Sequence, residues 1–221
     1  MRLHIPDGLM APEVSVLGYL IAFIVVALSV AKLRKAADDS AIPFMAILAA
    51  GIFVAQMINF PVLGGTSGHL LGAALATVLL GPFAGIVVMT VILIIQCLVF
   101  TDGGLLALGM NVLNMAVVGC LISWVVYRPI SRKSEKAAVV AAAWTSVFFA
   151  AVLATVELVI SYDMSGGSYG ISALIAIPSM LGYHALIGIG EAAITGSIFV
   201  FLSKVAPETL RMRIGRKEAS T

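Results

Sequence analysis

The side chains in this sequence best suited to bind a transition metal are histidines, because imidazole nitrogen is a common ligand of zinc, copper and nickel. The 221-residue chain has three, and His4 and His69 lie in the polar stretches HIPDG (residues 4–8) and GGTSGH (residues 64–69). Two imidazoles joined by an amine and a deprotonated amide near the chain start would form the planar four-nitrogen site that Ni(II) and Cu(II) favour. The alternative is that each histidine only bonds to loop backbone, and spacing alone does not decide.

Two further stretches have a similar glycine-rich character, FTDGG (residues 100–104) and SYDMSGGSYG (residues 161–170). The four stretches together contain three aspartates and no lysine or arginine, a balance that favours a cation over an anion. Groups that bond to a metal-binding histidine fix the orientation of its ring. We therefore predict that Asp7, Asn59 and Asp102 support the two histidines.

The elements that must position these stretches are transmembrane helices. The chain is 61% hydrophobic and 11% charged, whereas about a quarter of the residues of a soluble domain are charged. Its apolar runs approach the roughly 20 residues that a helix needs to cross a bilayer. We predict an all-α polytopic membrane protein with about seven transmembrane helices. They cover residues 13–32, 41–60, 68–81, 83–100, 105–127, 137–161 and 174–203.

The basic residues predict the orientation of the chain. All 13 Lys and Arg except Arg2 fall in three clusters, which follow the first, fifth and seventh runs. Odd-numbered spans end on one face, and the positive-inside rule makes that face cytoplasmic. The N-terminus is then outside and the C-terminus inside. We expect one transmembrane domain over residues 1–205 with an exported lip at 1–12, and a basic cytoplasmic tail at 206–221.

Polar side chains inside predicted spans are expensive in a bilayer and need partners. His184 and Glu191 are seven residues apart, so they share a face of the last helix. A structural hydrogen-bonded pair is favoured over support of a metal ligand. The full set is Asn59, Gln96, Asn111, Asn114, Glu157, His184 and Glu191.

An enzyme is the less favoured class. The stretch GTSG (residues 65–68) matches the G-x-S-G of rhomboid intramembrane serine proteases, with His184 as a candidate base. The earlier span, however, lacks the His and Asn that help to build the oxyanion hole in that family. The sequence also contains neither H-E-x-x-H nor a phosphate-binding loop, so it supports neither a zinc protease nor an ATPase.

Five ordered motifs, running from residue 4 to about 200, resemble the CbiM/NikM family. Members of that family are the metal-capturing S components of energy-coupling factor (ECF) transporters for cobalt and nickel. The motifs are HIPDG (4–8), GTSGHL (65–70), FTDGG (100–104), GMNVLNM (109–115) and HALIGIGE (184–191).

The resemblance implies a substrate site and partners. The metal, Ni²⁺ or Co²⁺, would be held outside the cell by the rings of His4 and His69 and by N-terminal nitrogens, here the backbone nitrogens of Leu3 and His4. The chain would be a multi-pass protein of a prokaryotic plasma membrane, without a nucleotide or nucleic acid of its own. Its partners would be a membrane coupling (T) subunit, two ATPase subunits and a small accessory membrane subunit. The pair Ala46 and Ala50 has the small-residue spacing that lets helices approach closely, and we expect the coupling subunit there.

Two alternatives stay open. Family members usually begin Met-His, whereas this chain begins Met-Arg-Leu-His. Either the nitrogen of Leu3 replaces the terminal amine, or translation starts at position 3, since UUG encodes leucine and also initiates. The alternative function is a stand-alone ion-coupled metal permease, for which Glu157 and Glu191 are the acidic candidates. Nickel and cobalt both accept nitrogen ligands, so the residues do not separate them.

Overall fold

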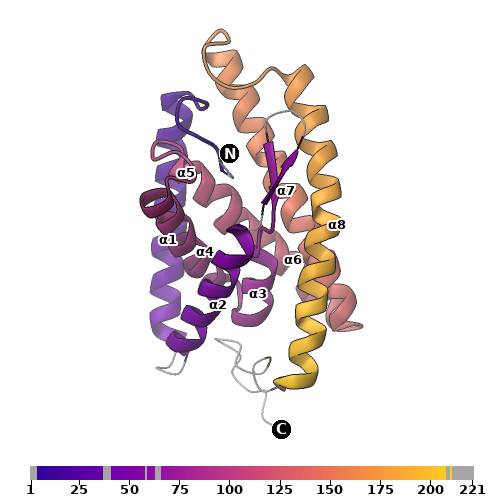
Figure 1. Ribbon diagram of the computed structural model, residues 1–221. Coiled ribbons are helices and arrows are strands. Elements are labelled where there is room, and N and C mark those ends of the chain that lie inside the picture. The colour runs from indigo at the N-terminus through magenta and orange to yellow at the C-terminus, as the bar shows by residue number, and fades with distance from the viewer. Residues whose placement is uncertain (1–3, 37–40, 58, 63–65, 208–209, 211–221) are drawn as a thin grey trace.

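The computed structural model describes residues 4–36, 41–57, 59–62, 66–207 and 210. Helices dominate this part of the chain, and one short two-stranded hairpin interrupts them (Figure 1). In chain order the elements are α1 (Pro12–Ala36), α2 (Ala41–Met57), β1 (Asn59–Val62), β2 (Thr66–His69), α3 (Ala73–Leu80), α4 (Pro82–Phe100), α5 (Leu108–Asn111), the π-helix η1 (Val112–Val118), α6 (Gly119–Ile130), α7 (Glu135–Met164) and α8 (Ala173–Val205).

Five helical segments in the described part of the chain are long and apolar enough to cross a membrane. They are α1, α4, the continuous run α5–η1–α6, α7 and α8. A sixth apolar helix, α2, has 17 residues. This arrangement confirms an all-α, multi-pass membrane protein.

The second and third predicted runs differ from simple spans. Helix α2 ends at Met57, and the antiparallel β1–β2 hairpin follows, with Asn59 opposite His69. Helix α3 then has 8 residues, about 12 Å at 1.5 Å per residue. Glycines with positive φ stand at both of its ends, Gly72 at 79° and Gly81 at 90°. The chain therefore rises through α2, turns through the hairpin and descends through α3 (Figure 1).

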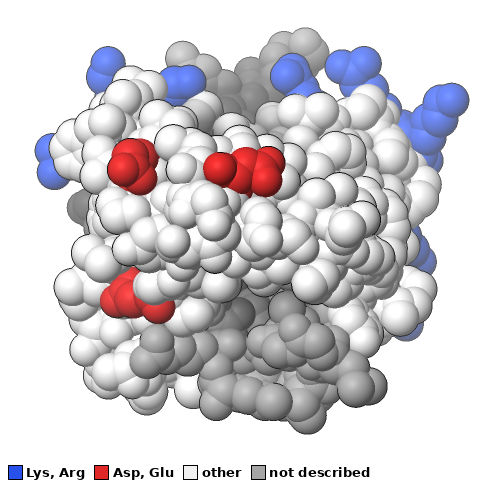
Figure 2. All heavy atoms as spheres, turned by 90° about the horizontal axis from the view of Figure 1, so that it is seen from above, with Lys and Arg blue, Asp and Glu red and all other residues white. Residues whose placement is uncertain are grey.

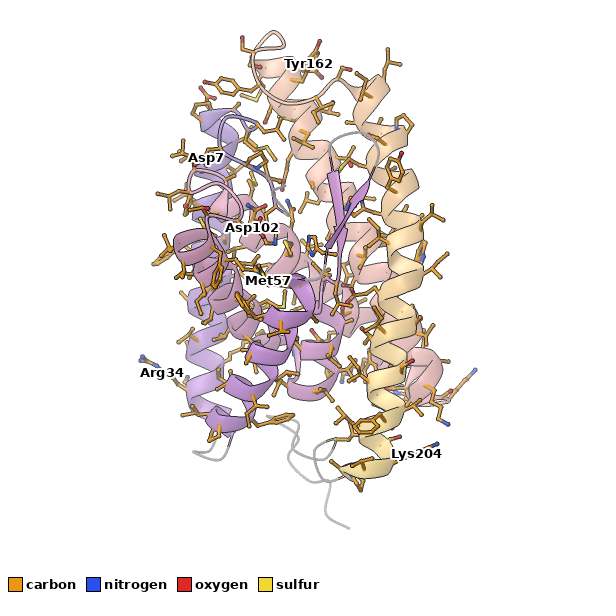
Figure 3. All side chains as sticks on the ribbon, viewed as in Figure 1. Asp7, Arg34, Met57, Asp102, Tyr162 and Lys204 are labelled. Carbon is orange, nitrogen blue, oxygen red and sulfur yellow. The ribbon has the colours of Figure 1, made fainter. Side chains whose placement is uncertain are left out.

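The two ends of the helix bundle differ in charge. Arg34 and Lys204 lie at the lower end, which we call the basic end, whereas Asp7, Asp102 and Tyr162 lie toward the opposite, upper end (Figure 3). The last turns of α1, α6 and α8 all carry basic residues. Viewed from above, the molecule shows acidic side chains on its near face and Lys and Arg at the margin (Figure 2). The three basic clusters of the sequence thus begin at one end of the bundle, as predicted.

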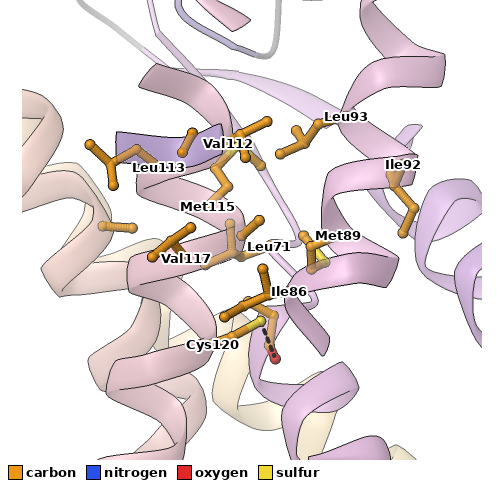
Figure 4. Close-up of a cluster of buried hydrophobic side chains, with 14 of the residues drawn as sticks. Leu71, Ile86, Met89, Ile92, Leu93, Val112, Leu113, Met115, Val117 and Cys120 are labelled. Carbon is orange, nitrogen blue, oxygen red and sulfur yellow. Dashed lines mark hydrogen bonds between the residues drawn. The ribbon is translucent and has the colours of Figure 1, made fainter. Parts of the chain in front are cut away.

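Helix α3 lies in the middle of the packing. All eight of its residues are buried, and it contacts α4, α6 and α7. Close approach at this point depends on small groups. A Cβ on Gly119 would lie 2.9 Å from that of Ala73, and the Cys120 thiol donates to the Ala73 carbonyl at 3.8 Å (Figure 4). Because lipid is as apolar as a protein core, such close packing is what holds helices together in a membrane. The hairpin above α3 therefore stands on a tightly packed base.

Candidate metal centre

The segment that carries His4 is held by the amide of Asn111, at the end of α5. Its Oδ1 accepts from the backbone nitrogen of Ile5 at 3.1 Å, and its Nδ2 donates to the Ile5 carbonyl at 3.1 Å. The backbone nitrogen of Gly104 donates to the same carbonyl at 2.9 Å. Both the N–H and the C=O of Ile5 are therefore paired, as they would be inside a β-sheet. This pairing holds the neighbouring residue, His4, in position.

Asp7 supports this segment in a way that differs from the prediction. Its carboxylate accepts hydrogen bonds from the backbone nitrogens of Leu105 at 3.0 Å, Leu106 at 2.7 Å and Ala107 at 3.3 Å. Asp7 was expected to orient a histidine ring. Instead it ties the N-terminal segment to the turn that precedes α5.

The loop between α4 and α5 approaches His4 closely. Gly103 has a φ of 90°, and a Cβ there would lie 3.0 Å from the Cβ of His4 and 3.3 Å from Nδ2 of Asn111. Glycine is the residue that tolerates both the left-handed backbone and this contact. In the same loop, Oδ2 of Asp102 lies 3.8 Å from Nδ1 of His4. Asp102 is thus placed beside the ring that it was predicted to support.

His69 ends β2, at the base of the hairpin, and its Nδ1 lies 2.9 Å from the carbonyl oxygen of Leu70. The next residues are anchored to two other helices. The carboxylate of Glu191, on α8, accepts from the backbone nitrogens of Leu71 at 2.6 Å and Gly72 at 2.8 Å. Nε2 of Gln56, on α2, donates to the Leu71 carbonyl at 2.7 Å.

Glu191 is 2% exposed, and both of its oxygens bind the start of α3, where the helix dipole favours a negative group. The ring of His184 bonds instead to the Met180 carbonyl at 2.7 Å. A structural role for both residues was predicted, but they act through different partners rather than as a pair. The sequence could not show that Glu191 supports the residues beside His69.

The structure brings the two predicted imidazole ligands together. The ring centroids of His4 and His69 are 5.3 Å apart and the ring planes meet at 79°. His4 is 7% exposed, and within the described residues its Nε2 is buried without a hydrogen-bond partner. Burial, and to a smaller extent the neighbouring His69, lowers the pKa of His4 from 6.5 to about 3, against an opposing hydrogen bond with the backbone of Asp102. The ring is therefore neutral near pH 7, as a metal ligand must be.

Side chains alone do not complete a metal site here. Among the residues that the structure describes, no three His, Cys, Asp or Glu side chains cluster as ligands. Two imidazoles fit a site in which backbone nitrogens supply the other donors. Leu3, the proposed source of one such nitrogen, lies outside the described residues, as do the side chain of Asn59 and residues 211–221 of the basic tail.

A cavity of about 110 Å³ adjoins the two histidines. It lies between η1, α7 and α8, and its wall combines polar groups with small and apolar ones. Its lining residues are His4, Ile5, His69, Leu71, Asn111, Asn114, Met115, Val147, Ala150, Ala151, Ala154, Met180, His184 and Ile187.

Several known proteins resemble this chain in sequence and in fold. The family described as "Cobalt uptake substrate-specific transmembrane region" (CbiM) matches residues 4–209. A putative fused nickel transport protein, NikMN, of Archaeoglobus fulgidus is 40% identical over 211 residues, which cover 96% of this chain and 69% of that protein. A putative metal transport protein of Haloquadratum walsbyi is 39% identical over 206 residues, 93% of this chain and 92% of the relative.

The crystal structure of a transition metal transporter superposes on this fold with a TM-score of 0.87 and 32% sequence identity. The match covers 95% of this chain and 96% of that one. The agreement extends over nearly the whole length of both chains. The chain therefore belongs to the CbiM family of cobalt-uptake substrate-specific transmembrane proteins.

Proposed function

We propose that this protein is the membrane component of a metal-uptake system that captures Ni²⁺ or Co²⁺ at the extracytoplasmic face for ATP-driven import by an ECF complex. The family and its cobalt and nickel transport relatives support metal uptake. The observation that carries the binding step is the pair of buried rings, His4 and His69, 5.3 Å apart. Imidazole nitrogens that are neutral and desolvated are suited to these borderline ions.

The proposed orientation rests on charge. His4 lies beside Asp102, which Figure 3 places toward the upper end, whereas the helix ends with basic residues lie opposite. Under the positive-inside rule the basic end faces the cytoplasm of a prokaryotic cell, and the metal centre faces out. The single domain over residues 1–205 and the cytoplasmic tail at 206–221 remain part of this proposal.

ATP hydrolysis is assigned to partner subunits, with a coupling subunit and a small accessory membrane subunit beside this chain. Ala46 and Ala50 on α2 are both exposed on the bundle surface, which supports the predicted contact with the coupling subunit. The permease alternative needs mobile acidic groups. Glu191 does not suit that role, because both of its oxygens are bound by backbone N–H groups.

The metal-binding step is tested on the purified full-length chain by equilibrium dialysis with Co²⁺ or Ni²⁺ and metal analysis. His4→Ala and His69→Ala should each lower the affinity by more than about 100-fold, since loss of a supporting group alone costs 10- to 100-fold. Ser67→Ala, in the same strand β2 as His69, is the matched control and should keep wild-type affinity. Unchanged binding in both histidine variants would refute the site.

A further inference from the structure

The cavity beside the metal centre has a second polar region that the two ligands His4 and His69 do not use. His184, on α8, and Asn114, on η1, both line it. They come from elements far apart in the sequence, and the remaining wall there consists of alanines of α7 and apolar side chains. Polar groups facing a cavity inside a membrane protein commonly mark the path of a substrate or ion.

His184 offers a lone pair. Its Nδ1 lies 2.7 Å from the Met180 carbonyl oxygen, and a carbonyl can only accept a hydrogen bond. In the neutral ring Nδ1 therefore carries the hydrogen, and Nε2 carries the lone pair. That hydrogen bond also fixes the ring, as it does for histidines that bind metals in other proteins.

Asn114 offers an oxygen. It is 3% exposed, and its Nδ2 donates to Oε2 of Glu157, on α7, at 2.7 Å. Its Oδ1 is buried and has no hydrogen-bond partner among the described residues. A buried carbonyl-type oxygen left without a donor is costly unless something fills the site. A cation would satisfy it, and the carboxyl group of Glu157 lies directly behind.

The backbone at Asn114 is itself unusual. Residues Val112–Val118 form a π-helix between α5 and α6. Such turns are rare and occur frequently at functional sites, because the wider turn changes the direction of the side chains it carries. Here the π-helix carries both Asn114 and Met115 in the cavity wall.

We infer that His184 and Asn114 form a second station for the same divalent transition metal ion, occupied after the ion leaves His4 and His69. The inference rests on the proposed function. The cavity, at about 110 Å³, is several times larger than one water molecule requires, so water can complete the coordination. The thioethers of Met115 and Met180 also line it and are tolerated by soft to borderline ions.

Two protein ligands make a weak site, and weakness suits transit. A tight second site would trap the ion, whereas conduction requires binding strong enough to enter and weak enough to leave. In the described residues no three His, Cys, Asp or Glu side chains cluster here. The station thus differs from the metal centre in affinity rather than in the ion it accepts.

The test removes the outer site first. The full-length double variant His4→Ala/His69→Ala is titrated with Co²⁺, using dialysis for stoichiometry and the visible absorption of Co²⁺ for its ligands. One weakly bound ion should remain. Adding His184→Phe, which keeps a ring, or Asn114→Leu, which keeps the volume, should weaken that ion at least about 10-fold. Leu186→Ala, a 66% exposed position two residues further along α8, is the matched control and should leave it bound.

Each outcome decides a different question. If the double variant binds no ion, or keeps its weak ion after both His184→Phe and Asn114→Leu, the second station is refuted. If the double variant instead keeps a tightly bound ion, the proposed metal centre at His4 and His69 is refuted. Size-exclusion profiles that match the wild type show that a variant is folded.

Discussion

The two imidazoles of the metal centre are held by supports of different construction. The segment of His4 is bonded along its length, through Ile5 to Asn111 and Gly104 and through Asp7 to the turn before α5. The hairpin of His69 is anchored at its base, where Glu191 and Gln56 bind the backbone of Leu71 and Gly72. An isolated two-stranded hairpin is at best marginally stable by itself. His4 therefore belongs to a segment that is bonded at several points, whereas His69 belongs to a hairpin that depends on a few contacts at one end.

The two supports indicate where the centre can open. An ion bound by both rings can leave only if one of them withdraws. Withdrawal of His4 would break several hydrogen bonds to buried groups, at a net cost of about 0.5–1.5 kcal/mol each. Withdrawal of His69 needs a change around Leu71, which α8 controls through Glu191. We therefore expect the hairpin to be the moving part.

The greatest loss of Co²⁺ affinity is expected when the bonds that hold the His4 segment are removed. Asn111→Leu keeps the volume of the side chain but removes both of its hydrogen bonds to Ile5. Losing one partner of a buried hydrogen bond costs about 1–3 kcal/mol, so affinity for Co²⁺ should fall roughly 5- to 150-fold. Equilibrium dialysis measures the loss, and an unchanged affinity would show that the Ile5 pairing does not position His4.

A smaller loss is expected at the base of the hairpin. Glu191→Gln keeps the shape but replaces one accepting oxygen by an NH₂ group, which cannot accept from Leu71 or Gly72. We expect about a 10-fold weaker site and faster release of Co²⁺ in a chelator-chase measurement. Ile189→Ala, at a 60% exposed position on the same helix, should leave both quantities unchanged. Slower release in Glu191→Gln would contradict the hairpin as the moving part.

The loop between α4 and α5 lies close to His4, and two glycines allow the importance of that contact to be tested. Gly103 and Gly8 both have positive φ, 90° and 84°, so alanine strains the backbone at either position. At Gly103 the added Cβ would also press on His4, whereas at Gly8 nothing lies within 4 Å. Gly103→Ala should therefore weaken Co²⁺ binding several-fold more than Gly8→Ala, at a strain cost of about 1 kcal/mol common to both. Equal losses of Co²⁺ binding in the two variants would show that the close contact between Gly103 and His4 does not matter for binding.

The last prediction does not involve the ion and concerns how the metal-free protein depends on pH. The pKa of His4 is lowered by burial to about 3, against 6.5 for an exposed histidine. When the N-terminal segment detaches from the protein, His4 is exposed and binds a proton between these two pH values. The attachment of the segment therefore weakens as pH falls from about 6.5 toward 3. The protection factor of the Ile5 amide, its intrinsic exchange rate divided by its observed rate at the same pH, should fall over that range. In His4→Ala this dependence should be reduced, and a persistent dependence would assign it to another group.

Much of the bundle was predictable from the sequence, because long apolar runs bounded by charge leave few alternatives. Helices α4, α7 and α8 begin and end within a few residues of the predicted limits. The predicted runs at 41–60 and 68–81 each included two residues of the hairpin strands, since so short a stretch has no period that separates strand from helix. Pro61 and the glycines around it were the available signal.

The site divides in the same way. His4 and His69 could be selected because histidine is rare in this chain and both fall in polar stretches. The support from Asn111 and Glu191 could not, because each binds backbone atoms more than 100 residues away, and backbone leaves no trace in residue identity. Asp7 was selected for its charge, and its actual partners are again backbone nitrogens.

The π-helix at Val112–Val118 also constrains the length of the chain. A π-turn closes over one residue more than an α-turn, so deleting one residue there would restore the ordinary winding. Because each residue turns an α-helix by about 100°, an extra residue in ordinary winding would rotate α6 against α5 by about that angle, whereas the wider π-turn takes it up locally. The deletion would therefore displace side chains of the turn itself, Asn114 among them, while Asn111 before the turn and α6 after it keep their directions. The extra residue thus places Asn114 in the cavity wall without changing the position from which Asn111 binds the N-terminal segment.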